Sequence, residues 1–329
     1  MEQSLNCAKK NLGYHYTSLQ ALFEIIKTKT LRLTNFSSSN DKKELQYKQE
    51  DFHSTLIKMA SEDSDEKYRQ YCKVTLESII EHIEEYAKHI NGPITAYGIS
   101  LTSDCDSLLH WDMYADQMYG VNIAIDIDAI GEIHKAYSSI KSNWAFLDYY
   151  KALYTQEEIY GFIKDKMLLF LDYIPHLKES TPQLDNRQIT ISNMYGWIAL
   201  TYDKMRRFVK QSEFSGEREK RIVFEENTIV ELRKMNEITE KSDEIDRIRH
   251  NEIEQAIFGL GLEKRYFYTS SRGIRSFHNL CLSGIWGSKL IPEVTLGPLC
   301  QQSENELRKF LDANGLQDTK IIVSNIPIR

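Results

Sequence analysis

The stretch that most constrains the fold lies close to the N-terminus, where a short strand passes directly into a helix at residues 13–20. Apolar side chains recur with a 3.6-residue period over residues 19–26, which predicts an amphipathic helix. Thr17 and Gln20 have the spacing of a capping box at its start. An imidazole at the end of a strand, just before a helix N-terminus, is well placed to contact a polar ligand. His15 is therefore a candidate site residue; a half-buried structural histidine is the alternative.

Composition indicates a soluble globular protein. Of the 329 residues, 41% are hydrophobic and 27% are charged, as in ordinary globular proteins. The length is sufficient for one large domain or two ordinary ones. No apolar run approaches the about 18 residues of a membrane span, and the first residues lack the features of a signal peptide. The five cysteines are scattered, which favours reduced thiols over disulfides or a zinc site. We expect a cytoplasmic protein with no membrane partner and no metal.

Charge argues against a general attraction to nucleic acid, because the net charge is −7. Two local stretches are nevertheless basic, one over residues 204–221 and one over residues 264–275. Each is either a nucleic-acid contact or an ordinary solvated face.

The pattern along the chain alternates strands with helical segments. Alternation and turn residues predict strands at 30–34, 94–101, 121–126, 144–154, 217–224, 264–269 and 276–282, one ending within 292–298, and one at 320–323. Helices are expected at 42–60, 66–90, 155–178, 190–211 and 302–313, with a short aromatic-rich helical turn at 108–114. We interpret residues 1–329 as a single domain in which about 42–90 and about 155–211 are helical insertions on a β core.

The stretch from 214 to 224 carries the most informative charges. Strand alternation places Glu217, Glu219 and Arg221 on one face. Two carboxylates that enter an apolar run are costly unless they are paired or used. The pattern indicates either a functional site or a charge ladder on an edge strand, with Arg221 as the partner.

Searches for common catalytic motifs exclude several chemistries. The chain has no nucleophile elbow, no glycine-rich phosphate loop of the G-x-x-x-x-G-K-[ST] type and no zinc-binding H-E-x-x-H helix. The candidates that remain come from three strand or turn regions: His15, Tyr16, Ser100, Trp111, Tyr114, Glu217 and Glu219.

Five groups of residues, in the same order along the chain, resemble a bacterial family known only as a domain of unknown function. They are Tyr14–Ser18 with the helix and Leu31–Leu33 after it; Ser39–Asp41 with Glu44; the Ser100 strand leading to Leu109, Trp111, Tyr114, Ala115 and Gly120; Phe214, Glu217, Glu219 and Arg221; and Ile291, Glu293, Val294 and Leu296–Pro298. That family in turn resembles a remote branch of the ADP-ribosyltransferase fold, which includes diphtheria-type toxins and RNA- and DNA-modifying toxins.

The resemblance implies an α+β fold with a split β-sheet core, helical insertions, and NAD as substrate without a metal. Its three-part signature would fall on His15, on Tyr114 or Ser100, and on Glu219. His15, Tyr16 and Thr17 would approach the adenosine ribose and diphosphate. Tyr114 with Trp111 would stack on nicotinamide, and Ser100 would line the same cleft.

The same resemblance implies roles for the late charges. Glu219 would stabilise the positive charge on the ribose, Glu217 would orient or deprotonate the acceptor, and Arg221 would keep both carboxylates ionised.

Three functions compete at this point. The first is an ADP-ribosyltransferase that modifies RNA, DNA or a protein, acting as a toxin or antiphage-defence effector with an antitoxin or regulatory partner. The second is an NAD glycohydrolase, with water as acceptor. The third is a non-catalytic module that binds a nucleotide or a nucleic acid.

Overall fold

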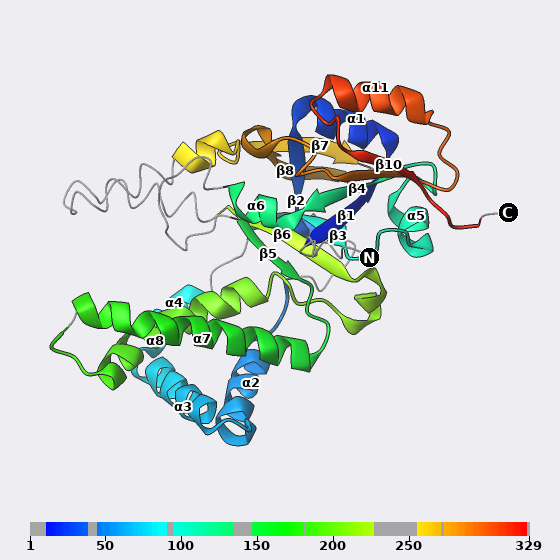
Figure 1. Cartoon of the computed structure of the whole chain (residues 1–329). Coiled ribbons are helices and arrows are strands. Elements are labelled where there is room, and N and C mark those ends of the chain that lie inside the picture. Colours follow the sequence, from blue (N-terminus) through cyan, green and yellow to red (C-terminus); the bar gives the residue numbers. More distant parts are fainter. Residues whose placement is uncertain are drawn as a thin grey trace, which may run out of the picture. The chain divides into compact units, whose positions relative to one another are not determined.

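The computed structural model describes residues 11–38, 45–90, 95–133, 147–180, 182–226, 255–270 and 273–327 (Figure 1). The chain forms two compact units, each assembled from separate stretches of sequence. Unit 1 comprises residues 1–38, 95–151 and 215–329, and unit 2 comprises residues 39–94 and 152–214. The predicted motif residues Ser39–Asp41 and Glu44 lie outside the described residues, as does Arg272 of the second basic stretch.

Unit 1 is a mixed α/β structure built on an open sheet. Its strands are β1 (Leu12–Thr17), β2 (Thr30–Asn35), β3 (Ala96–Thr102), β4 (Val121–Asp126), β5 (Leu147–Lys151), β6 (Glu219–Glu225), β7 (Arg265–Ser270), β8 (Gly273–Cys281), β9 (Glu293–Leu296) and β10 (Lys320–Val323). The main order is β10-β9-β4-β1-β3-β2-β8-β7, and β6 pairs with both β3 and β5. Among these described strands, β9 and β10 run parallel and the other pairs antiparallel. The strand predictions at 30–34, 121–126, 264–269, 276–282 and 320–323 are confirmed.

The sheet branches at β3. One edge of β3 pairs with β6 along its whole length, from Ala96 to Thr102. The other edge pairs with β2 at Tyr97 and Gly98, and with β1 at Thr102. Between these two ladders, residues 99–101 have no strand partner on that edge within the described strands. The sheet is therefore locally split between β1 and β2.

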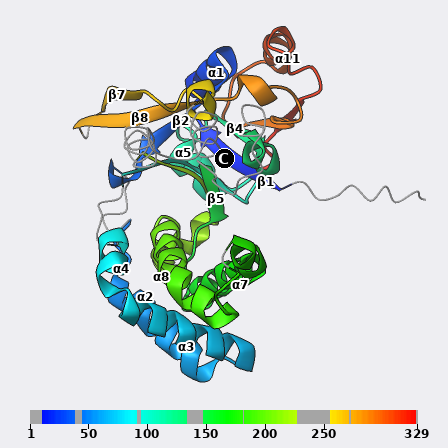
Figure 2. The same ribbon diagram turned by 90° about the vertical axis from the view of Figure 1, so that its left-hand side faces the viewer.

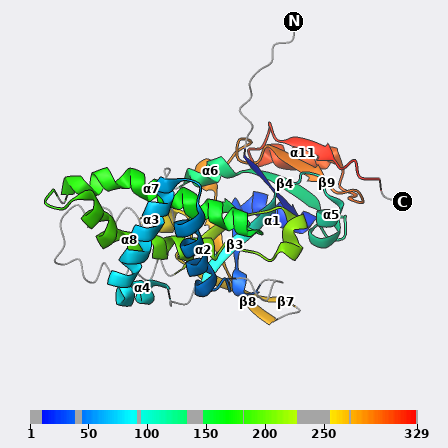
Figure 3. The same ribbon diagram turned by 90° about the horizontal axis from the view of Figure 1, so that it is seen from below.

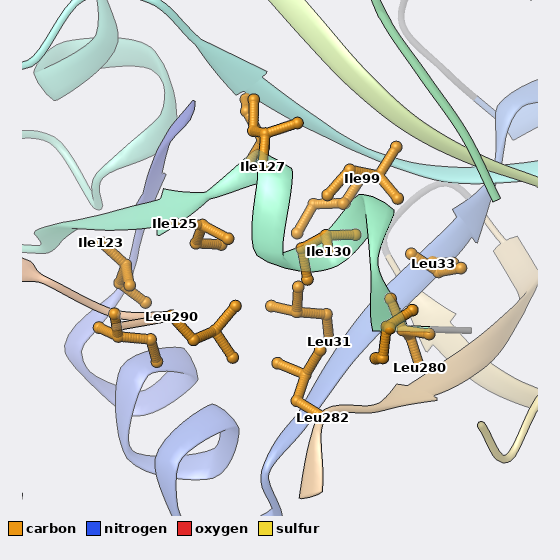
Figure 4. Packing of buried hydrophobic residues seen from close by; sticks show 14 of the residues in the cluster. Leu31, Leu33, Ile99, Ile123, Ile125, Ile127, Ile130, Leu280, Leu282 and Leu290 are labelled. Atoms are coloured by element: carbon orange, nitrogen blue, oxygen red, sulfur yellow. The ribbon is translucent and has the colours of Figure 1, made fainter. Parts of the chain in front are cut away.

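A hydrophobic core covers one face of this sheet. The helices α1 (Leu19–Thr28) and α11 (Glu304–Ala313) lie over it side by side, and the rings of Phe23 and Phe310 stack with centroids 5.2 Å apart (Figure 1). Leucines and isoleucines of β2, β3, β4 and β8 pack with two isoleucines of α6 (Ile127–Gly131), as Figure 4 shows. The 3.6-residue period of α1 and the alternation of β4 both put their apolar side chains into this core.

The start of α1 differs from the prediction. Ser18, not Thr17, is the N-cap, and its hydroxyl accepts a hydrogen bond from the Ala21 amide at 3.1 Å. Thr17 is still strand, because it pairs with Val121 of β4. The Gln20 side chain donates to Glu24. The capping-box prediction is therefore wrong: strand pairing continues through Thr17 and moves the helix start by one residue.

Unit 2 is helical among its described residues. It contains α2 (Gln49–Glu62), α3 (Glu66–Glu81), α4 (Ile83–Ile90), α7 (Gln156–Ser180) and α8 (Asn186–Met205). The segments treated above as insertions, about 42–90 and about 155–211, fall inside this unit. Figures 2 and 3 show α3 lying along α8, which also packs against α7. The expected single helix over 66–90 is interrupted at His82, which ends α3.

A buried carboxylate ties the two halves of unit 2 together. The Asp63 side chain accepts hydrogen bonds from Lys164, at 3.1 Å, and from the Tyr160 hydroxyl.

No helix in the described part of the chain has the length and hydropathy to cross a membrane.

Candidate functional site

Glu219 and Arg221 form a buried ion pair at the start of β6. They lie two residues apart, so their side chains share one face of the strand. Arg221 donates from Nε to Oε1 of Glu219 at 2.9 Å and from Nη2 to Oε2 at 3.0 Å, and the two side chains are only 1% and 3% exposed. A two-pronged pair of this kind fixes the orientation of the carboxylate. Because β6 is flanked by β3 and β5, this is not the edge-strand ladder considered above.

Ser100 completes the surroundings of this carboxylate. It lies opposite Arg221 in the β3–β6 register, and its hydroxyl donates to Oε1 of Glu219. The Phe36 ring packs against the guanidinium, with its centroid 5.0 Å from Cζ of Arg221. Phe36 fits here because residue 98 is glycine; a Cβ at Gly98 would lie 2.3 Å from the ring.

His15 approaches the same serine from β1. Its Nδ1 lies 3.3 Å from the Ser100 carbonyl oxygen, and because a carbonyl only accepts, Nδ1 carries the hydrogen. Burial lowers the pKa of His15, and the hydrogen bond to Ser100 acts in the opposite direction. The neutral ring therefore has Nε2 as an acceptor. Through its carbonyl and its hydroxyl, Ser100 connects His15 with Glu219 at the split of the sheet.

Glu217 does not share the strand face of Glu219, which corrects the sequence prediction. It ends a 3-10 turn over Ser212–Glu217, and Arg218 after it has a φ of 43°. This left-handed residue breaks the alternation on which the prediction relied. The Glu217 carboxylate instead accepts a hydrogen bond from the Tyr114 hydroxyl at 2.7 Å. Its carbonyl accepts one from Nε2 of His110 at 3.1 Å.

Tyr16 and Trp111 are buried and hold α5 (Leu108–Tyr114) against β1. Their rings meet edge to face at 4.7 Å, and the Trp111 indole N–H donates to Asp106 at 2.6 Å. The Tyr16 hydroxyl donates to the Asp104 carbonyl and accepts from the Ser107 amide. Burial raises the pKa of Tyr16. Because both rings are buried, we interpret them as residues that support the position of α5, and not as ligand contacts.

Thr17, also predicted to bind a ligand, lies half-buried at the end of β1. The loop after α5 passes directly against it: a Cβ at Gly120 would lie 2.2 Å from the Thr17 carbonyl oxygen.

Two residues of this cluster were not predicted from the sequence. His110 lies in the aromatic-rich turn beside Trp111, which was the available signal. No pattern marks Phe36, because its contact with Arg221 depends on the pairing of β2, β3 and β6.

Residues 110–222 match DUF2971, a family of proteins of unknown function. The DUF2971 match begins at His110 and includes Tyr114, Glu217, Glu219 and Arg221. For that part of the chain it agrees with the expected resemblance to a family of unknown function. No curated protein and no solved structure matches the chain.

Proposed function

We propose that this protein is an NAD-dependent ADP-ribosyltransferase that modifies a macromolecular acceptor. The observation that supports it is the contact of Ser100 with both His15 and Glu219, made where one edge of β3 has no partner among the described strands. At this split in the sheet, the side chain of His15 contacts the Ser100 carbonyl and the side chain of Glu219 contacts the Ser100 hydroxyl, so that three strands contribute to one cluster. The resemblance places the signature residues on an early, a middle and a late element, and His15, Ser100 and Glu219 lie on β1, β3 and β6.

Ser100 is the better candidate for the middle signature position. It contacts Glu219 directly, whereas Tyr114 contacts Glu217. His15, with Nε2 free to accept, would bind a ribose hydroxyl of the adenosine half of NAD. Because Trp111 is buried, we assign it no direct contact with nicotinamide.

The residues fit the charge that this reaction develops. When the bond between ribose C1′ and the nicotinamide nitrogen breaks, nicotinamide leaves with the bonding electron pair and positive charge develops on the ribose. A carboxylate whose orientation is already fixed stabilises such charge without reorganising. Glu219 takes this role, held by Arg221 and Ser100. The acceptor then bonds to C1′ and transfers its proton to Glu217.

A role as a toxin or antiphage-defence effector in the cytoplasm, with an antitoxin or regulatory partner, follows from the resemblance alone. Hydrolysis of NAD by water would use the same first step.

A non-catalytic nucleotide-binding module is the second candidate. The 3% exposure of Glu219 favours it, because both carboxylate oxygens are already engaged within the protein.

Nicotinamide release from NAD by the purified protein separates these functions. We expect release by the wild type and a loss of about 10²-fold or more in Glu219→Gln. Glu226→Gln is the matched control, because Glu226 also binds an arginine, Arg265, at 2.8 Å, but lies outside the site. Circular dichroism checks that both variants fold. NAD binding without any release from the wild type would favour the binding module.

A further inference from the structure

The outer side of α5 carries exposed apolar side chains. His110, Trp111 and Ala115 face inward and are buried. On the opposite side, Leu109 and Met113 lie one helical turn apart and are 42% and 53% exposed. Exposed apolar side chains gathered on one helix face are typical of an interaction surface.

The same side of α5 is acidic. Asp112 is exposed and shares the i, i+3, i+4 stripe of Leu109 and Met113, and Asp116 is exposed in the turn that follows α5. Residues 103–119 contain four aspartates and neither lysine nor arginine. The guanidinium of Arg218, the residue after Glu217, is bound to Asp104 at 3.0 Å. A surface of this charge repels a phosphate backbone and attracts a cation.

This stripe adjoins the residue assigned to the acceptor. The Tyr114 hydroxyl at the end of α5 contacts Glu217, and the Ser103 amide donates to the Arg218 carbonyl at 3.1 Å. A Cβ at Gly216 would lie 3.8 Å from the Leu109 side chain. We call Leu109, Asp112, Met113, Asp116 and Glu217 the α5 surface.

The basic residues of 204–221 are largely engaged elsewhere. Arg206 and Arg207 bind Asp203, and Arg221 binds Glu219. The Lys220 ammonium donates to the Asn11 side chain at 2.9 Å and to the Leu12 carbonyl at 2.8 Å. These contacts remove the sequence argument for a nucleic-acid acceptor in this stretch.

We propose that the α5 surface docks a protein acceptor through a segment that carries both basic and apolar side chains. The proposal rests on the transferase function proposed above, and it selects protein over nucleic acid as the acceptor class. The apolar side chains of the segment pack on Leu109 and Met113, and its cations face Asp112 and Asp116. Docking there brings the segment next to Glu217.

Binding is measured first, by fluorescence anisotropy with three labelled probes. They are a short amphipathic peptide of lysine and leucine, its counterpart with glutamate in place of lysine, and a single-stranded RNA oligonucleotide. Of these three probes, we expect only the basic peptide to bind. Met113→Ser should weaken its binding about tenfold, the scale set by burial of one apolar side chain. Asp112→Lys should weaken it by a similar factor, because it replaces an attraction for the cations of the peptide with a repulsion.

Two matched controls lie on other elements of unit 1. Phe267→Ser removes an apolar side chain of β7 that is 65% exposed, and Glu304→Lys makes the same charge reversal on α11. Both should bind the basic peptide like the wild type. Equal binding by the α5 variants and the wild type, or preferential binding of the RNA, would overturn the proposal.

Nicotinamide release without any acceptor is recorded for every variant. Met113→Ser and Asp112→Lys should retain it while they lose transfer of label from NAD to a lysine-, arginine- and serine-containing version of the basic peptide. If neither the wild type nor any variant releases nicotinamide, but peptide binding still depends on Met113 and Asp112, the docking surface is supported and the proposed reaction is rejected. Transfer to RNA that is unaffected by either substitution would reject the α5 surface and keep the reaction.

Discussion

Arg221 holds both carboxylate oxygens of Glu219, at 2.9 and 3.0 Å, from two residues further along the same strand. Because both side chains are almost completely buried, water solvates neither charge. Each partner therefore depends on the other, and the loss of one leaves an uncompensated charge inside unit 1.

We expect Arg221→Met to lower the free energy of unfolding by about 3–5 kcal/mol, because it leaves Glu219 buried without its cation. The double variant Glu219→Gln/Arg221→Met should lose clearly less than the sum of the two single losses. Urea denaturation of the four proteins measures this coupling. Additive losses would show that the two charges do not depend on each other.

Ser100 and Tyr114 should differ in which step they affect. Ser100→Ala removes a hydrogen bond to the Glu219 carboxylate, and we expect about a tenfold or greater loss of nicotinamide release. Tyr114→Phe removes the hydrogen bond to Glu217, so release from NAD alone should be retained while transfer to an acceptor falls. Equal loss of release in both variants would contradict the assignment of Ser100 to the middle signature position.

Stability should fall as the solution becomes acidic. Burial lowers the pKa of His15, His110 and His278, with nearby carbonyl or carboxylate groups acting in the opposite direction. The unfolded chain therefore takes up protons first as the pH falls below about 6.5, which favours unfolding. The stability that the neutral buried histidines provide is fully present above about pH 6.5. It decreases as the pH falls below this value, until the folded-state pKa values are reached.

Urea unfolding between about pH 7 and about pH 5 measures the effect. His278→Phe should reduce the pH dependence, because this ring is buried between Tyr97 and Phe224, with centroids 4.5 and 5.2 Å away. Stability that stays constant or increases toward about pH 5 would contradict the prediction.

Two glycines offer a test of the backbone around α5. Gly120→Ala places a Cβ 2.2 Å from the Thr17 carbonyl oxygen and 2.8 Å from that of Ala115, so the loop after α5 must move. We expect the free energy of unfolding to fall by about 2 kcal/mol or more, and the tryptophan fluorescence, to which the buried Trp111 contributes, to change. Gly196→Ala is the control, because nothing lies within 4 Å of a Cβ there. Since Gly196 is inside α8, alanine should stabilise by about 0.5–1 kcal/mol. Similar losses in both variants would contradict the prediction.

The elements that the sequence predicted well depend on near neighbours. The apolar run after Gly120 placed β4 at Val121–Asp126, and residues 108–114 were expected to form a short helical turn, as α5 does. The common face of Glu219 and Arg221 is also local, because it follows from a two-residue spacing within one strand. The prediction for Glu217 used the same rule and is wrong, because Arg218 adopts a left-handed conformation that the residue type does not signal.

The sequence by itself determined the positions of most strands and of α5, and the common strand face of Glu219 and Arg221, because periodicity and side-chain spacing act over a few residues. Only the tertiary structure decided which residues surround that pair. Ser100 reaches Glu219 across 119 positions of sequence, and His15 reaches Ser100 across 85. These contacts depend on the branching of the sheet at β3 and on the registers of β1, β3 and β6. Strand order and register are set by packing of the whole core, which no local pattern encodes.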